Sequence, residues 1–280
     1  MEAIQKTISE LKETLAMKER LLGEEHDDLL PVLNKIAVLL REIGRYDEAL
    51  EFKQRAFDLE EKEFERYKHD PKKAVNFAVC LKELGTLLDI LGETNRALPI
   101  FERIVSLNEA AHGEDSPAVA RTLNDVAWLL KKSGEEDEAE MLYLKAMDIR
   151  KEKYGPEHPR FGETMNNYAC FLLSQERFRE AETLLRKARV IFNKWRKPSH
   201  PDSLNVKGNL GLALKGQGHF EEAKPLVDEA VSKLVSMHQL TVNHPRVLKF
   251  QQAKKEIDEL VANDFQTETA SVPPSEPEDD

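Results

Sequence analysis

The chain repeats itself with a period near 42 residues, and this period is the feature that most limits its possible folds. A marker position recurs at Gly44, Gly92, Gly134, Glu176 and Gly218, in steps of 48, 42, 42 and 42 residues. Around every marker there is a small residue seven positions before, a leucine four before, an alanine five after, and alanine or isoleucine twelve after. Five copies that agree at four offsets indicate tandem repeats of one structural unit.

Each repeat is predicted to be two antiparallel helices joined by a tight turn at the marker. The small residues let the two backbones approach closely, and the leucines fill the seam between them. A glycine at the marker can adopt the left-handed conformation that ends a helix. Glu176 lacks this freedom, so we expect its turn to be strained or differently shaped. The predicted fold is all-α: a right-handed α-solenoid of about five helix pairs with a single helix at each end.

The links between repeats contain proline at a fixed place, which predicts where the next helix begins. Proline suits the first turn of a helix, and the residue before it is pushed out of the α region. Ser116 is expected to be an ordinary N-cap, and the histidines at the same place are expected to start helices, one repeat apart and too distant to share a metal. The dipeptides are Asp70-Pro71, Ser116-Pro117, His158-Pro159, His200-Pro201 and His244-Pro245.

The ends of the chain differ from the repeats. Residues 1–22 are predicted to form an N-terminal helix, whose apolar stripe consists of Ile4, Ile8, Leu11, Leu15 and Leu22. Residues 23–263 are assigned to the solenoid, with a capping helix from about residue 244. Residues 264–280 are rich in proline and acidic residues and are expected to be a disordered tail.

Charge and composition exclude several classes of function. The formal net charge is -11, which disfavours nonspecific binding of nucleic acid and of anionic membranes. Two cysteines make no disulfide framework, and the chain has neither a bilayer-length apolar run nor a targeting segment at residues 1–20, so we expect a cytoplasmic protein. Since no catalytic, phosphate-binding or metal-ligand motif is present, we expect no enzyme activity, no catalytic residues, no metal site and no cofactor.

The repeats resemble those of tetratricopeptide proteins, and in particular the longer repeats of the kinesin light chain type. Three segments carry the resemblance: LNKIAVLLREIGRYDEAL at 33–50, LNDVAWLLKKSGEEDEAE at 123–140 and MNNYACFLLSQERFREAE at 165–182. The links LLGEEHDD at 21–28 and KYGPEHPR at 153–160 match as well. The resemblance covers roughly residues 21–263. Kinesin light chains also carry a long heptad-repeat segment that binds the heavy chain, and the stretch before the first repeat is too short for it.

The resemblance implies a peptide-binding groove on the concave face, lined by the first helix of each pair. Asparagine amides would bind an extended peptide backbone, Trp128 would contact an apolar or aromatic anchor, and basic residues would pair with acidic ligand residues. Alternatively, the asparagines bridge neighbouring helices and Trp128 packs against the adjacent repeat. The expected groove residues are Asn34, Lys35, Lys82, Arg121, Asn124, Trp128, Lys131, Asn166, Asn167 and Asn209.

Two functions remain open from the sequence. The first is a protein–protein interaction scaffold or adaptor that binds an extended segment of a protein or peptide partner in the groove. The second is an oligomerisation or assembly factor that acts through the convex face or the end helices. The regular lysine and asparagine set of the carboxylate clamp is absent, which disfavours a chaperone cofactor.

Overall fold

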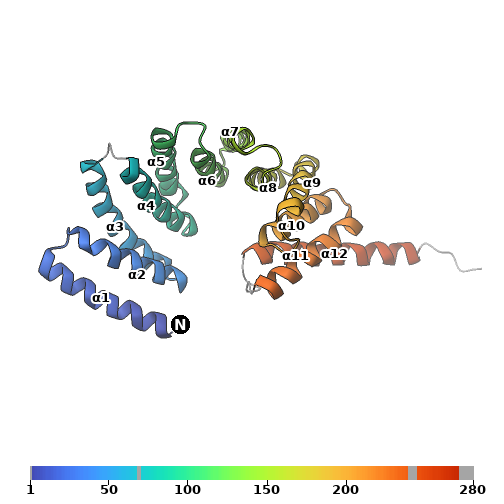
Figure 1. Ribbon diagram of the computed structural model, residues 1–280. Coiled ribbons are helices and arrows are strands. Elements are labelled where there is room, and N and C mark those ends of the chain that lie inside the picture. The colour runs from blue at the N-terminus through green and yellow to red at the C-terminus, as the bar shows by residue number, and fades with distance from the viewer. Residues whose placement is uncertain (1, 68–70, 239–244, 271–280) are drawn as a thin grey trace, which may run out of the picture. The chain divides into compact units, whose positions relative to one another are not determined.

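The computed structural model describes residues 2–67, 71–238 and 245–270, and these residues form twelve α-helices, one short 3-10 helix and no strand. The elements follow one another along the chain as labelled in Figure 1. Their bounds are α1 (Glu2–Leu22), η1 (Asp27–Leu29), α2 (Leu30–Glu42), α3 (Tyr46–Arg66), α4 (Pro71–Ile90), α5 (Thr94–His112), α6 (Pro117–Ser133), α7 (Glu136–Tyr154), α8 (Pro159–Ser174), α9 (Phe178–Trp195), α10 (Pro201–Gly216), α11 (Phe220–His238) and α12 (Pro245–Ala270).

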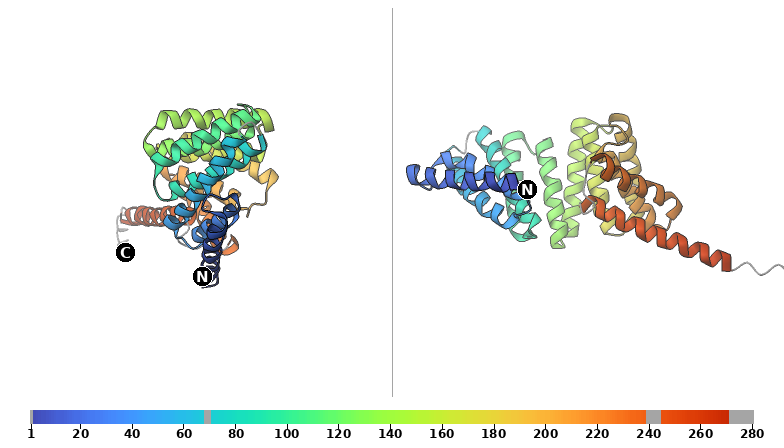
Figure 2. Two further views of the ribbon diagram at one scale, coloured as in Figure 1. Left: turned by 90° about the vertical axis from the view of Figure 1, so that its left-hand side faces the viewer. Right: turned by 90° about the horizontal axis from the view of Figure 1, so that it is seen from below.

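The chain forms two compact units, Met1–Ile149 and Arg150–Asp280, and the division between them falls within α7. In the first unit, each helix from α1 to α5 packs on the helix that follows it. In the second, the same holds from α8 to α11, and consecutive helices lie side by side in the views of Figure 2. Packing between sequence neighbours is the arrangement of an α-solenoid, so the predicted all-α fold of antiparallel helix pairs is confirmed.

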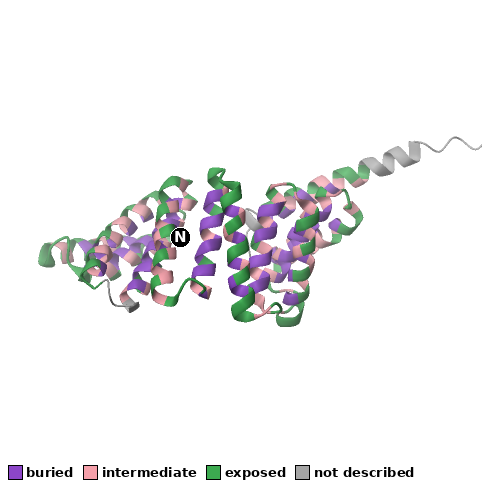
Figure 3. Cartoon of the chain, turned by 90° about the horizontal axis from the view of Figure 1, so that it is seen from above, coloured by how far each residue is buried: buried purple, intermediate pink, exposed green. Residues whose placement is uncertain are grey.

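The repeated small residues lie at the contacts between paired helices. The alanines five positions after each marker are all fully buried, as are the leucines four positions before it, or nearly so. A side chain at Gly85 would meet the Phe101 ring at 2.7 Å, and one at Gly211 would meet Val227 at 2.5 Å. Buried residues gather where consecutive helices meet (Figure 3). Close backbone approach therefore explains the small residues of the repeat.

All five turns at the marker share one backbone geometry. The four marker glycines have φ between 79° and 90°, and Glu176 has φ 57°, the one positive φ of a non-glycine residue within the described segments. In each turn the N–H after the marker donates to the repeat's leucine carbonyl at 2.9 Å, as Arg177 does to Leu172. The Glu176 turn therefore has the same shape as the others and carries the expected strain.

The links cap the helices that follow them. Ser116 Oγ accepts a hydrogen bond from the Val119 N–H at 3.3 Å, as expected. The histidines use the ring instead: Nδ1 of His26, His158 and His200 accepts from the backbone N–H two residues later, at 3.1–3.2 Å. An imidazole nitrogen thus replaces the usual cap oxygen at three links. His244 lies outside the described residues.

The helices at the two ends of the solenoid, α1 and α12, differ in how they pack on their neighbours. On α1, Ile8 and Leu15 are buried and Ile4 and Leu11 pack beside them, whereas Leu22, the last residue of the predicted stripe, is exposed. At the other end α12 packs on both α10 and α11. It continues to Ala270, so the expected start of the tail at residue 264 lies within a helix. Residues 271–280 lie outside the described part of the chain.

Candidate functional site

Two adjoining hollows lie along the first helices of the pairs in the unit Met1–Ile149. The first, of about 670 Å³, is lined by α2, α3 and α4. The second, of about 470 Å³, is lined by α4, α5 and α6 together with Arg41 at the end of α2. Val79 and Glu83 of α4 line both, so the two hollows form one groove, and Val79 is 57% exposed in it.

A buried lysine organises the floor of the first hollow. Lys53 of α3 donates to Asn34 Oδ1 at 2.7 Å and to Glu83 Oε2 at 2.6 Å, and Asn34 donates on to Glu60 at 3.3 Å. Burial raises the pKa of the neighbouring Cys80 thiol to about 12, which keeps it protonated and unreactive at neutral pH. The network joins α2, α3 and α4, so it fixes the shape of the hollow.

Positive charge without a partner lies along both hollows. Lys35 lines the first, and Arg41 and Arg121 line the second. Within the described residues these three cations make no ion pair or hydrogen bond. Lys82 differs, because its ammonium pairs with Asp125 at 2.5 Å, which links α4 to α6. The groove therefore offers free cations to a ligand while its other charges are paired internally.

Trp128 is accessible from outside the unit. It lies on α6 and is 44% exposed, with the Lys131 ammonium 5.2 Å from the ring centre. That distance is in the range of a cation–π contact. An indole held in this way offers an exposed apolar face beside a positive charge.

The asparagines make their hydrogen bonds inside the chain. In the first unit Asn34 belongs to the Lys53 network, and Asn124 is buried and donates to the Ala120 carbonyl at 2.7 Å. In the second unit Asn209 is 1% exposed; it donates to Asn166 Oδ1 at 2.8 Å and accepts from Lys249 at 2.7 Å. Asn34, Asn166 and Asn209 thus join helices, whereas the Asn124 bond lies within α6.

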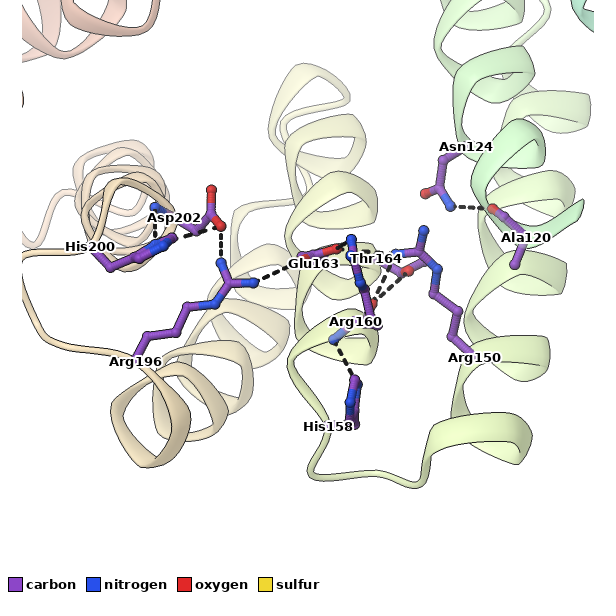
Figure 4. Close-up of polar contacts among 10 residues, drawn as sticks. All are labelled: Ala120, Asn124, Arg150, His158, Arg160, Glu163, Thr164, Arg196, His200 and Asp202. Atoms are coloured by element: carbon purple, nitrogen blue, oxygen red, sulfur yellow. Dashed lines mark hydrogen bonds and ion pairs between the residues drawn. The ribbon is translucent and has the colours of Figure 1, made fainter. Parts of the chain in front are cut away.

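In the unit Arg150–Asp280 the starts of the first helices are joined by charged contacts (Figure 4). Arg196 donates to Glu163 at 2.8 Å and also bonds Asp202, which ties α8 to α10. Arg160 and Arg150 both reach Glu163 as well, at 3.1 Å and 3.7 Å. Among the predicted groove residues of this unit, Asn167 is exposed and Asn166 is half-buried. The arginines of this cluster therefore pair mainly with carboxylates on neighbouring helices.

The groove also contains residues that the repeat pattern did not single out. Lys53 stands nine positions after its marker, where the other four repeats carry Phe101, Tyr143, Leu185 and Val227. A lysine at an otherwise apolar core position was a signal for the polar floor. Val79 gave no such signal, because its exposure depends on how α2 and α6 flank α4.

Membrane-spanning helices and metal-binding clusters are both absent from the described segments. None of the helices described is both long and apolar enough to cross a bilayer. No cluster of three or more histidine, cysteine, aspartate or glutamate side chains within 2–67, 71–238 and 245–270 is arranged to hold a metal ion.

The repeat family is established by comparison with known proteins. The tetratricopeptide repeat model matches residues 2–62, 77–152, 131–189 and 160–232, which together are most of the chain. The chain therefore belongs to the tetratricopeptide repeat family. Comparison with curated proteins finds no match.

Solved structures identify the type of repeat. BtubC (BKLC) from P. vanneervenii superposes with a TM-score of 0.64 at 21% identity, covering 86% of this chain and 95% of that one. The Q17M variant of the nearly identical TPR-like repeats of a Podosopora anserina "putative kinesin light chain" gives 0.60 at 20%, covering 77% and 99%. Apo RapI gives 0.58 at 13%, covering 94% and 72%. The fold is that of kinesin light chain-like tetratricopeptide proteins.

Proposed function

We propose that this protein is an interaction scaffold that binds an extended segment of a partner protein in the groove of the unit Met1–Ile149. The observation that carries the proposal is the pair of adjoining hollows that share Val79 and Glu83. A continuous groove with apolar walls and polar groups at intervals suits a chain in extended conformation, which presents side chains alternately to its two faces.

The charge of the groove defines the kind of segment that it would accept. Lys35, Arg41 and Arg121 have no partner within the described residues, so a ligand with acidic side chains would neutralise them. Trp128 and Lys131 add a second place of contact on α6, where an apolar or aromatic anchor would cover the indole ring. The proposed ligand combines an apolar or aromatic side chain with acidic neighbours.

In this proposal four of the asparagines and Lys82 do not touch the ligand. Asn34, Asn166 and Asn209 hold neighbouring helices together, and Asn124 bonds within its own helix, α6. Lys82 joins α4 to α6 through Asp125. Lys35, Arg121, Trp128, Lys131 and the exposed Asn167 remain as residues that would touch a ligand. We further propose that the protein acts as an adaptor in the cytoplasm and without catalysis of its own.

Selection of a random peptide library on the full chain, followed by fluorescence anisotropy of the selected peptides, tests this proposal. Val79→Glu places a charge in the groove and is expected to weaken binding by about tenfold or more. Val190→Glu is the matched control, because Val190 is an exposed valine on α9. If both variants bind like the parent chain, or if no peptide is selected, the groove is not the binding site.

Self-association through α1 is a second candidate function. Met17 and Leu21 follow one another by one helical turn and are 64% and 75% exposed, an unusual exposure for such large apolar side chains. Light scattering of the full chain and of Met17→Glu/Leu21→Glu measures the effect. A dimer that becomes a monomer in the double variant would favour this function, and a monomeric parent chain would exclude it.

A further inference from the structure

The second hollow contains more unpaired positive charge than any acidic residue in it can balance. Three cations, Arg41, Lys82 and Arg121, line it against Glu83 alone, and the His112 ring also lines it. Glu83 is occupied by Lys53 at 2.6 Å, and Lys82 by Asp125 at 2.5 Å. The guanidinium groups of Arg41 and Arg121 and the exposed His112 ring are left without a partner among the described residues.

The walls of the second hollow make these charges more effective. Val75, Ala78 and Val79 of α4 and Ala118 of α6 provide apolar surface. A polar pair also lies there, in which Asn108 donates to the Thr122 hydroxyl at 3.0 Å. Water is less able to screen an anion beside apolar walls, so charge-assisted hydrogen bonds from arginine gain strength.

Charge balance distinguishes the anions that could enter. A carboxylate carries a single charge and would neutralise one of the two guanidinium groups. A phosphate monoester carries about -1.5 to -2 at neutral pH and has three strong acceptor oxygens. Its charge matches two free arginines, and each arginine has five N–H donors in a planar fork that suits phosphate oxygens.

We propose that the second hollow binds the phosphorylated side chain of a serine or threonine in the partner segment. This inference rests on the proposed function, since it assigns one position of the peptide within the groove. It makes recognition conditional on phosphorylation of the partner, with the first hollow and Val79 contributing the contacts that do not depend on it.

A peptide array on the full chain tests the proposal. Three sets of 15-residue peptides share degenerate flanks and carry serine, phosphoserine or glutamate at the centre. The phosphoserine set is expected to bind about tenfold more tightly than both others. Equal binding of phosphoserine and glutamate would overturn the proposal, because it would mean that a single negative charge is enough.

Substitutions in the second hollow test whether its arginines cause the preference for phosphoserine. Arg121→Gln and Arg41→Gln are each expected to reduce the phosphoserine preference roughly tenfold, and Arg121→Lys to reduce it in part, because lysine keeps the charge and loses the fork. Arg66→Gln is the matched control, because Arg66 is an exposed arginine at the end of α3 that lines neither hollow, and it should leave the preference unchanged. A preference that survives both arginine variants would contradict the proposal.

Two further arms separate related outcomes. Inorganic phosphate that competes as well as a phosphopeptide would mean a site for the free ion, which overturns a peptide ligand. If serine peptides bind, weaken with Val79→Glu and show no phosphate preference, the groove function stands and the phosphate inference fails. If none of the three sets binds, both fail.

Discussion

The layer of first helices differs between the two units, although both follow the same repeat. In Met1–Ile149 the position ten before the marker holds Asn34, Lys82 and Asn124, and the groove opens along this layer. In the fifth repeat the same position is Gly208, and a side chain there would lie 2.4 Å from the Phe250 ring. Phe250 is fully buried, so α12 closes on α10. The glycine of the fifth repeat thus leaves the room that the Phe250 ring fills.

The largest expected effect follows from removing the residue that closes the second unit. Phe250→Ala leaves a cavity over Gly208 and is expected to lower the free energy of unfolding by about 3–5 kcal/mol. Hydrogen exchange read by mass spectrometry should show the loss in α10–α12. Leu248→Ala is the control, because Leu248 is exposed on the same helix, and a change within about 0.5 kcal/mol is expected. Similar losses in both variants would refute the closed inner face.

A second comparison concerns the polar residues beneath each inner face. Lys53→Met leaves Asn34 and Glu83 without their common donor. Asn209→Ala removes the donor to Asn166 Oδ1 and one acceptor of the Lys249 ammonium. Each is expected to lower the free energy of unfolding by about 1–3 kcal/mol, measured by urea denaturation.

The two variants should differ in a second readout. Lys53→Met is expected to change peptide binding, since Lys53 lines the first hollow, whereas Asn209→Ala should not. Peptide affinity that is lost equally in both variants would mean that the groove is not confined to the first unit.

Substitutions in the turns of the two units are expected to change the free energy of unfolding by smaller amounts and in opposite directions. Glu176→Gly relieves a left-handed conformation and is expected to raise the free energy of unfolding by about 1 kcal/mol. Gly134→Ala, at the same place in the first unit, should lower it by a similar amount. Gln175→Gly is the control next to Glu176, since its φ of -92° is ordinary and no gain is expected. Thermal unfolding measures all three, and a gain at residue 175 equal to that at 176 would contradict the explanation.

The helix caps give the last comparison, between Ser116 in the first unit and His158 in the second. Ser116→Ala and His158→Ala each remove one acceptor and are expected to lower the free energy of unfolding by about 1 kcal/mol. His158→Asn restores a cap acceptor and should recover most of the loss. If asparagine proves no better than alanine, stacking of His158 on Tyr154, with ring centres 4.6 Å apart, is the main contribution of this residue.

Much of the fold could be predicted from the sequence because it depends on local repetition. The small residues at Gly85 and Gly211 and the glycine turns reflect contacts within one helix pair, and the proline links join one pair to the next. The strain at Glu176 was also predictable, since a left-handed residue is required at the marker in every copy. Such features need no knowledge of more distant packing.

The groove was predictable only in part. Lys35 and Arg121, two of the predicted groove residues, line the hollows, but the second helices α3 and α5 line them as well as the first helices. The role of Lys35 and Arg121 in binding stays a prediction. For the asparagines two roles were open, contact with a ligand and bonds between helices. Asn209 is buried and bonds Asn166 of α8 and Lys249 of α12, whereas the buried Asn124 bonds the Ala120 carbonyl of its own helix. Which partner an amide finds depends on the distance between neighbouring repeats. Residues such as Gly208 affect this distance, and the spacing of residues in the sequence does not predict it.

The packing of each helix on the next along the chain has a consequence for how the molecule forms. Contacts between sequence neighbours close short loops, so a helix pair can fold early and serve as a template for the pair beside it. Unfolding proceeds by the reverse route, from the termini inward, with free energies of opening that rise toward the middle of each unit. α1, which packs on α2 with Met17 and Leu21 still exposed, is therefore expected to be the first helix to exchange its amide hydrogens.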